Sequence, residues 1–235
     1  MAPIVHATSG RLLDGMRLLR WSLVAAFALV SFAGCATKLR EPSNLAAHKA
    51  EIREYVNTGG YDGDLEEISR DALAWIEQRA ARRKPGERLA IVLDLDETLF
   101  RNWSRIDQSD FTYVPADWDR WVAQASTPPI EPVRELFHAA RRERVEVILI
   151  TGRPEKHRRD TETNLLRIGC DDYQALICSP DASEEPATVF KAAQRERITK
   201  EGRTIIVNVG DQGSDLVGGF AERTFKLPNP FYLTE

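Results

Sequence analysis

The chain lacks an excess of basic residues. Its 235 residues include 32 Lys and Arg against 36 Asp and Glu, so the formal net charge is −4. Domains that bind nucleic acid usually carry a basic patch or stripe, and this balance therefore speaks against a nucleic acid polymer as partner. The sequence also has no internal repeat and no low-complexity tract, and 43% of its residues are hydrophobic. These features are typical of one globular domain with a sizeable core.

Long apolar runs are also missing. The run from Trp21 to Ala33 is interrupted only by two serines, yet it is shorter than the ~20 residues that a membrane-spanning helix needs. Three arginines precede this run and small residues end it, which is the pattern of a secretory signal. We therefore expect a signal peptide over residues 1–34, a polar tether over 35–46 and a folded domain over 47–235.

Cys35 follows Phe-Ala-Gly directly, and this ending resembles the lipobox of bacterial lipoproteins. The resemblance implies that lipid is attached to Cys35 and that the protein is anchored to a membrane of the cell envelope. Ala36 follows in place of Asp, which by resemblance to lipoprotein sorting in Gram-negative bacteria favours the outer membrane. An ordinary cleaved signal with an incidental cysteine, or an uncleaved anchor, is the alternative.

Cysteine is scarce: besides Cys35 there are only Cys170 and Cys178. An oxidising compartment would permit a disulfide between these two. Cys170, however, follows an expected helix end and Cys178 lies in an expected strand, which favours two buried thiols. Neither has a histidine at a spacing typical of a metal site.

Apolar strands alternate with helical patterns along the rest of the chain, which predicts an α/β fold with a Rossmann-like parallel sheet flanked by helices. Two helices come first, over 47–57 and over 65–83, where Asp64 and Glu67 offer a capping pair for the second. Gly169 and Gly202 stand where helices should stop. We expect strands at 89–94, 145–150, 174–178, 203–209 and 222–227, and further helices at 130–143, 154–168, 186–200 and 214–219.

The first strand of this pattern ends in acidic residues, in the segment IVLDLDETLFR at 91–101. Alternate residues of a strand share a face, so Asp94 and Asp96 should emerge together at its carboxyl end, where open α/β sheets bind ligands. Buried carboxylates need compensation, and a hard cation such as Mg²⁺ would provide it. An ordinary strand followed by a solvated acidic turn is the alternative for this motif alone.

Three later stretches complete a pattern: a strand that ends in Thr151 and Gly152, a helix that carries Lys191, and a strand that ends in Gly-Asp before Asp215. Together with DxDxT, this order resembles the haloacid dehalogenase-like superfamily. The segments DLDETLF, GDQGSDL and FKLPNP most resemble its third-subfamily acid phosphatases. Those comprise bacterial class C lipoprotein acid phosphatases and plant acid phosphatases with their storage-protein relatives. The resemblance covers roughly residues 45–235.

The resemblance implies a role for each acidic residue. Asp94 is the expected nucleophile, which forms an aspartyl-phosphate. Asp96 is the expected general acid and base, and its backbone carbonyl should reach the metal. Asp211 should supply a second carboxylate to Mg²⁺, and Asp215 should orient that set of ligands or bind a metal-bound water. The implied metal site thus comprises Asp94, Asp96, Asp211 and Asp215.

The remaining motif residues are expected to bind phosphate or to support the site. Thr151 and the Gly152 N–H should hydrogen-bond the phosphoryl oxygens, and Lys191 should place its ammonium against them. A lone lysine on a helix is usually solvated, and only its position between the other motifs singles it out. Thr98 should brace the loop between the first two carboxylates, while Arg153 stays outside the primary set.

A small cap insertion separates the first strand from the next helix, between Phe100 and Ile130. It holds five aromatic residues, among them Trp118 and Trp121, and it should lie over the carboxyl end of the strand. Such a segment could stack an aryl group or a nucleobase. The alternative, which we favour for most of these aromatics, is a small satellite core.

The sequence therefore predicts a Mg²⁺-dependent acid phosphatase acting on small phosphomonoesters, such as nucleotides or aryl phosphates, outside the cytoplasm. One alternative is a binding or storage protein on the same fold, since some plant relatives lack the aspartate nucleophile. Another is a phosphotransferase or phosphonate-type relative, which the absence of a large cap domain disfavours.

Overall fold

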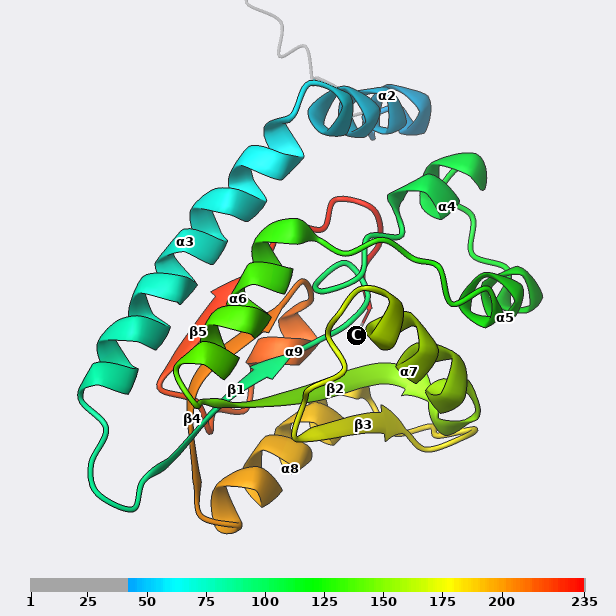
Figure 1. Ribbon diagram of the computed structural model, residues 1–235. Helices are drawn as coiled ribbons and strands as arrows, with labels where there is room; N and C mark the ends of the chain where they lie inside the picture. The colour runs from blue at the N-terminus through cyan, green and yellow to red at the C-terminus, as the bar shows by residue number, and fades with distance from the viewer. Residues whose placement is uncertain (1–41, 235) are drawn as a thin grey trace, which may run out of the picture. The chain divides into compact units, whose positions relative to one another are not determined.

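A parallel five-stranded sheet forms the centre of the domain, as Figure 1 shows for the computed structural model. The structure describes residues 42–234, so Cys35 and the expected signal peptide lie outside it. The strand order is β3-β2-β1-β4-β5, and every pairing is parallel. The strands are β1 (Arg88–Leu93), β2 (Glu146–Pro154), β3 (Ala175–Ser179), β4 (Arg203–Gly210) and β5 (Arg223–Lys226). The predicted α/β class and parallel sheet are confirmed.

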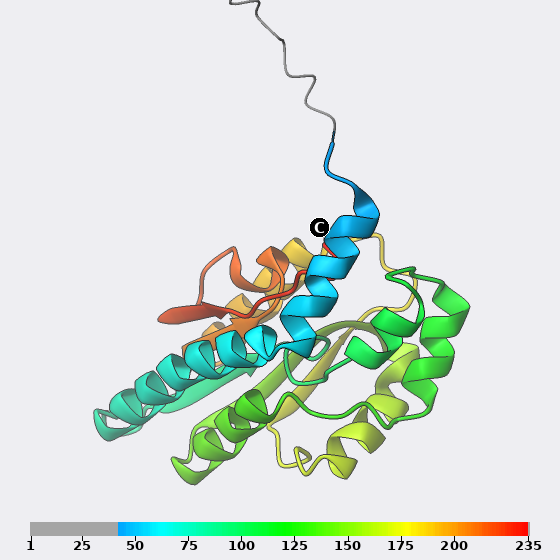
Figure 2. The same ribbon diagram turned by 90° about the horizontal axis from the view of Figure 1, so that it is seen from above.

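Helices cover both faces of this sheet. Helices α3 (Gly60–Ala81) and α6 (Glu131–Arg142) pack against each other on one face, with α7 (Arg158–Arg167) beside them (Figure 2). Helix α8 (Ala187–Lys200) covers the other face. The side chains of β1 alternate accordingly between two apolar clusters, with Leu89, Ile91 and Leu93 in one and Ala90 and Val92 in the other.

The strand order places a topological switch at β1. The chain runs outward from β1 to β2 and β3, then returns to pair β4 with the other side of β1. Ligands bind at such switch points, outside the carboxyl ends of the strands. Asp94 follows β1 and Asp211 follows β4, and the Asp94 N–H donates to the Val209 carbonyl at 3.1 Å. The fold alone therefore brings these two carboxylates to one place.

The largest differences from the sequence prediction are at the start of α3 and around the end of β2. Helix α3 begins at Gly60 and not near residue 65, after Gly59 adopts a left-handed φ of 85°. The expected capping pair is therefore wrong, and Asp64 lies inside the helix, where it accepts a hydrogen bond from the Tyr55 hydroxyl at 2.5 Å. A single helix over 154–168 is also wrong, because β2 runs to Pro154 and a 3₁₀ turn over Glu155–His157 precedes α7.

The cap insertion forms two short helices, α4 (Trp103–Gln108) and α5 (Pro115–Ala123), near the carboxyl ends of the strands (Figure 1). Helix α2 (Leu45–Asn57) precedes α3, and the one-turn helix α9 (Gly213–Leu216) follows β4. Cys170 and Cys178 are both buried free thiols. Within residues 42–234 no helix is both long and apolar enough to cross a membrane.

Candidate active site

Four of the predicted site residues meet at the carboxyl ends of β1 and β4. The carboxylates of Asp94, Asp211 and Asp215 offer oxygen atoms that all lie within 4.8 Å of one another, and all three residues are buried. The Lys191 ammonium reaches them from α8 and contacts Asp94 Oδ1 and Asp215 Oδ1, each at 2.5 Å. Lys191 is thus a buried member of the site and not a solvated helix residue.

Three side chains orient the Asp211 carboxylate. The Thr98 hydroxyl donates to its Oδ1 at 3.0 Å, while the Gln212 and Asn229 amides donate to its Oδ2, each at 2.7 Å. Thr98 therefore links the loop after β1 to the acidic residue after β4. Its backbone N–H also donates to the carbonyl of Leu95, the residue between Asp94 and Asp96, at 3.2 Å. Because these donors satisfy part of its hydrogen-bonding capacity, Asp211 is held in one orientation.

Asp215 is fixed by the backbone around it. Its Oδ2 accepts the Gln212 N–H at 2.8 Å in a capping box at the start of α9. Gly210 passes so close that an added Cβ would lie 2.3 Å from the Asp215 Cβ. The glycine of the GDxxxD motif thus leaves room for the second aspartate of the same motif.

The electrostatics of this acidic cluster favour a bound cation. Burial raises the pKa of Asp94 well above its usual range; the Lys191 ammonium opposes this shift, and the Asp215 and Asp211 carboxylates add to it. Burial, followed by the Asp215 carboxylate, likewise raises the pKa of Asp211. Burial alone would lower the pKa of Lys191, but Asp94 and Asp215 raise it above its usual range. Three carboxylates facing one ammonium leave negative charge uncompensated, so the donor set fits a divalent metal ion.

Asp96 lies apart from this acidic cluster. Its carboxylate forms a two-point pair with the buried Arg153, which donates from Nε at 2.8 Å and from Nη2 at 2.6 Å. The Asn102 amide donates to Asp96 Oδ1 at 3.0 Å. Arg153 and Asn102 are therefore site residues that the sequence analysis left out, although Arg153 follows the Thr-Gly motif directly. Metal contact through the Asp96 backbone carbonyl stays a prediction.

The predicted phosphate-binding residues follow at the end of β2. Thr151 is buried, and its hydroxyl accepts the Arg153 N–H at 3.1 Å. Gly152 is exposed and lines the same cavity as Asp94, Asp96 and Lys191. The cavity volume is about 650 Å³, which is in the range of small-molecule sites.

Aromatic side chains form much of the outer wall of this cavity. Phe111, Tyr113 and Trp118 come from the cap and Phe231 and Tyr232 from the end of the chain. Trp118 is thus a wall residue, contrary to the satellite-core interpretation.

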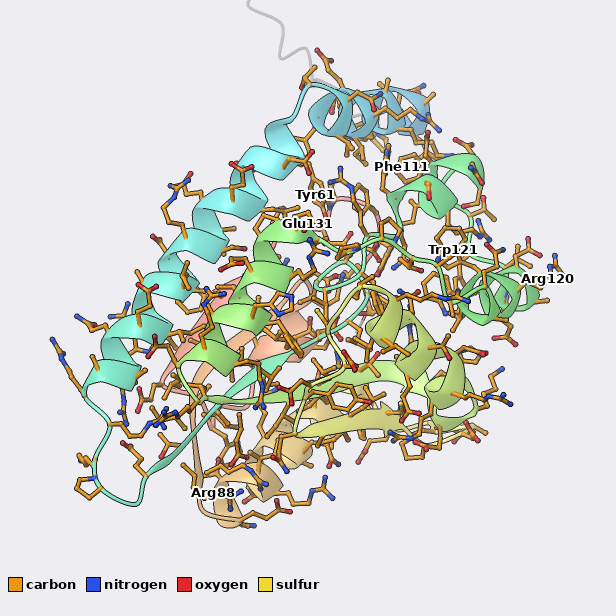
Figure 3. The ribbon with its side chains drawn as sticks, in the orientation of Figure 1. Tyr61, Arg88, Phe111, Arg120, Trp121 and Glu131 are labelled. Carbon is orange, nitrogen blue, oxygen red and sulfur yellow. The ribbon has the colours of Figure 1, made fainter. Side chains whose placement is uncertain are left out.

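Trp121 has a different position. It does not line the cavity, and its indole N–H donates to Asn102 Oδ1 at 2.8 Å. Figure 3 shows Trp121 directed from α5 toward the interior and Arg120 directed away from it. The two tryptophans that the sequence treated alike therefore have separate surroundings.

The cap is tied to its neighbours on two sides. From α2, Arg53 donates to Asp107 at 2.6 Å and to Asp110 at 3.0 Å, and its guanidinium lies 5.2 Å from the Phe111 ring centroid. On the other side, His157 Nε2 lies 3.0 Å from an Asp119 carboxylate oxygen. These two residues lie far apart along the chain, so no sequence pattern pairs them.

The segment after β5 also contributes to the site, which sequence reasoning missed apart from noting FKLPNP. Besides the Asn229 bond to Asp211, the Tyr232 hydroxyl donates to the Glu97 carboxylate at 2.5 Å. Glu97 is buried at a left-handed φ of 56°. Burial, then the nearby Asp96 and Asp211 carboxylates, raises the pKa of Glu97 to about 8. This segment has no helix or strand pattern, so only its motif could have marked it.

Comparisons with known proteins agree with this geometry. The family model for HAD superfamily, subfamily IIIB (acid phosphatase) matches residues 35–235. Acid phosphatase 1 of Solanum lycopersicum is 31% identical over 186 residues, which are 77% of this chain and 72% of that protein. Vegetative storage protein 1 of Arabidopsis thaliana is 28% identical over 189 residues, 78% of this chain and 69% of that protein. In fold, the class C acid phosphatase from Bacillus anthracis gives a TM-score of 0.67 at 18% identity, covering 80% of this chain and 85% of that chain.

Proposed function

Because this chain belongs to the acid phosphatases of HAD subfamily IIIB, we propose that it hydrolyses small phosphomonoesters in a Mg²⁺-dependent reaction through an aspartyl-phosphate. The observation that carries this proposal is the contact of the buried Lys191 ammonium with Asp94, at the base of an open cavity beside two further carboxylates. A carboxylate held against a cation at the end of a central strand is suited to nucleophilic attack on phosphorus.

In the proposed first step, an Asp94 carboxylate oxygen attacks phosphorus and the bond from phosphorus to the ester oxygen breaks. Asp96, carrying a proton, delivers it to the departing oxygen. In the second step, water attacks the aspartyl-phosphate and gives a proton to Asp96, which releases inorganic phosphate and restores Asp94. Lys191, with Thr151 and the Gly152 N–H, would hold the phosphoryl oxygens throughout.

Mg²⁺ is the cation proposed for the acidic cluster, held by Asp94 and Asp211 together with the Asp96 carbonyl and with Asp215 orienting the set. Oxygen-only donors favour a hard cation. When bound, the ion would neutralise negative charge between the nucleophile and the phosphoryl group.

Asp94→Asn tests this function. Because the covalent route disappears, kcat on p-nitrophenyl phosphate should fall by more than ~10³-fold while the melting temperature stays close to that of the wild type. Asp172→Asn is the matched control, since Asp172 lies on the surface and pairs only with Arg141 among the described residues. A near wild-type rate for Asp94→Asn would remove Asp94 as nucleophile. A wild-type protein that binds phosphate esters without hydrolysing them would favour the binding or storage alternative.

The substrate class proposed is aryl phosphates and nucleoside monophosphates. The aromatic wall formed by Phe111, Tyr113 and Trp118 supports it, since flat rings stack on such side chains. No large cap domain covers the cavity among the described residues, which suits varied esters.

Attachment to a membrane of the cell envelope through lipid on Cys35 completes the proposal, with the outer membrane favoured. It rests on the short apolar run that ends in Phe-Ala-Gly-Cys. When cells are labelled with a fatty-acid analogue, the label should appear on the wild-type protein and not on Cys35→Ser. Equal labelling of both proteins, or release of the wild type in soluble form, would contradict the lipid anchor.

A further inference from the structure

The carboxylate expected to handle protons is held by an asparagine that no motif singled out. Asn102 is fully buried between the loop after β1 and helix α4. Its Nδ2 lies 3.0 Å from Asp96 Oδ1 and 3.3 Å from Glu97 Oε2, and its backbone N–H donates to Glu97 Oε1 at 2.8 Å. One asparagine thus hydrogen-bonds two neighbouring acidic side chains, Asp96 and Glu97.

A tryptophan of the cap fixes the orientation of this amide. The Trp121 indole N–H donates to Asn102 Oδ1 at 2.8 Å. An indole can only donate, so it requires the amide oxygen on its side and directs the amide NH₂ toward Asp96 and Glu97. The reverse orientation would place the amide oxygen against the Asp96 carboxylate and the NH₂ against the indole N–H, leaving buried groups unpaired.

The same cap helix also supplies part of the cavity wall. Trp118, which lines the cavity, precedes Trp121 by three residues on α5. Asp96 lines that cavity as well. The hydrogen-bonded path from Trp121 through Asn102 to Asp96 therefore connects a helix that lines the cavity with the carboxylate expected to protonate the leaving group.

We infer that Asn102 is a positioning residue for Asp96 and that Trp121 supports it, so that the cap sets the geometry of proton transfer to the leaving group. This role rests on the proposed phosphatase function, in which Asp96 acts as the general acid. Arg153 holds the same carboxylate from the side of β2, whereas Asn102 and Trp121 hold it from the side of the cap.

Leaving-group dependence distinguishes this role from simple support of the fold. p-Nitrophenyl phosphate has a good leaving group that departs with little protonation, while benzyl phosphate has a poor leaving group that needs a proton. Both esters carry one aromatic ring, so the cavity wall contacts a similar group in each substrate. The parameter to compare is kcat/KM. It covers the steps up to formation of the aspartyl-phosphate and does not include the later attack of water on that intermediate.

For Asn102→Ala, kcat/KM on benzyl phosphate should fall ~10²-fold, within the range that general acid catalysis contributes, and on p-nitrophenyl phosphate by less than ~5-fold. Trp121→Phe keeps an aromatic ring but removes the N–H, so it should shift the ratio of the two substrates in the same direction by a smaller factor, ~3-fold or more. If Asn102→Ala fails to fold, Trp121→Phe still carries the comparison.

Asn164→Ala is the matched control. Asn164 is an equally buried asparagine, but its amide bonds the Thr127 backbone from α7 and contacts no carboxylate of the site. It should lower the melting temperature and leave the substrate ratio unchanged.

Three outcomes would overturn the inference. Equal losses of kcat/KM on both esters in Asn102→Ala, or an unchanged substrate ratio in Trp121→Phe, would mean that the two residues only support the fold. Either result would leave the proposed phosphatase function intact. A wild type inactive on both esters would instead overturn the proposed function and this role with it.

Discussion

A single residue without a side chain allows the acidic cluster to close. Gly210 lies where an added Cβ would be 2.3 Å from the Asp215 Cβ and 2.4 Å from its Oδ2. Asp215 cannot yield easily, because Lys191 and the Gln212 N–H hold its two oxygens. Gly210→Ala should therefore destabilise the fold by roughly 1–3 kcal/mol, as overpacking does, and should lower phosphatase activity by displacing Asp215. Thermal unfolding and kcat measure the two effects.

Gly213→Ala provides the comparison for this substitution. Gly213 lies three residues later, at the start of α9, and an added Cβ there would meet nothing within 4 Å. Equal melting temperatures and rates for the two variants would contradict the close approach at Gly210.

Strand order and residue chemistry together explain which site residues could be predicted from the sequence. Asp94 was expected at a ligand-binding edge because it follows a buried strand. Asp211 and Lys191 were assigned to the same site through the family resemblance. Asp94 and Asp96 were expected to emerge together at the end of the strand, and both line one cavity there. Their carboxylates have different partners, Lys191 for Asp94 and Arg153 for Asp96, which strand alternation could not predict.

At the scale of elements, helix α5 contributes to the cavity through Trp118. Trp118→Ala should lower the preference for nucleoside monophosphates over small aliphatic phosphates by roughly ten-fold, since stacking on a base contributes ~1–3 kcal/mol. The melting temperature should change little, because Trp118 is only partly buried. The measurement is kcat/KM for both substrate classes beside thermal unfolding. Equal losses of kcat/KM on both substrate classes, with a large drop in melting temperature, would instead mean that Trp118 is part of a satellite core.

The order of strands and helices was predictable because most strands are short apolar runs and because glycines mark helix ends, as at Gly169 and Gly202, where φ is positive. The cap was not predictable in detail. Its helices α4 and α5 have six and nine residues, too few for a clear helical period. The segment from Pro228 to Thr234 has no regular structure, and its contacts with Glu97 and Asp211 join residues far apart in sequence.

At the scale of the whole molecule, folding brings together more negative charge than the protein itself compensates. Asp94, Asp211 and Asp215 are buried around one lysine, and the pKa values of Asp94 and Asp211 are raised, with burial as the largest cause. The unfolded chain keeps these carboxylates apart and hydrated. A cation that binds only the folded cluster must therefore stabilise the fold, independently of any catalysis.

Mg²⁺ should accordingly raise the melting temperature of the chelator-treated protein. At a concentration of 100 times Kd the stabilisation should be ~2.7 kcal/mol. For a domain of this size each kcal/mol corresponds to roughly 2–4 °C, so the expected shift is about 5–10 °C.

K⁺ at equal ionic strength should give a much smaller shift, because screening alone does not fill the cluster. Asp211→Asn should reduce the Mg²⁺ response, since it removes one anionic ligand while keeping an oxygen in place. A melting temperature that does not respond to Mg²⁺ at any concentration, in a protein that remains active in chelator, would mean that Lys191 and the surrounding hydrogen bonds suffice to hold these carboxylates together.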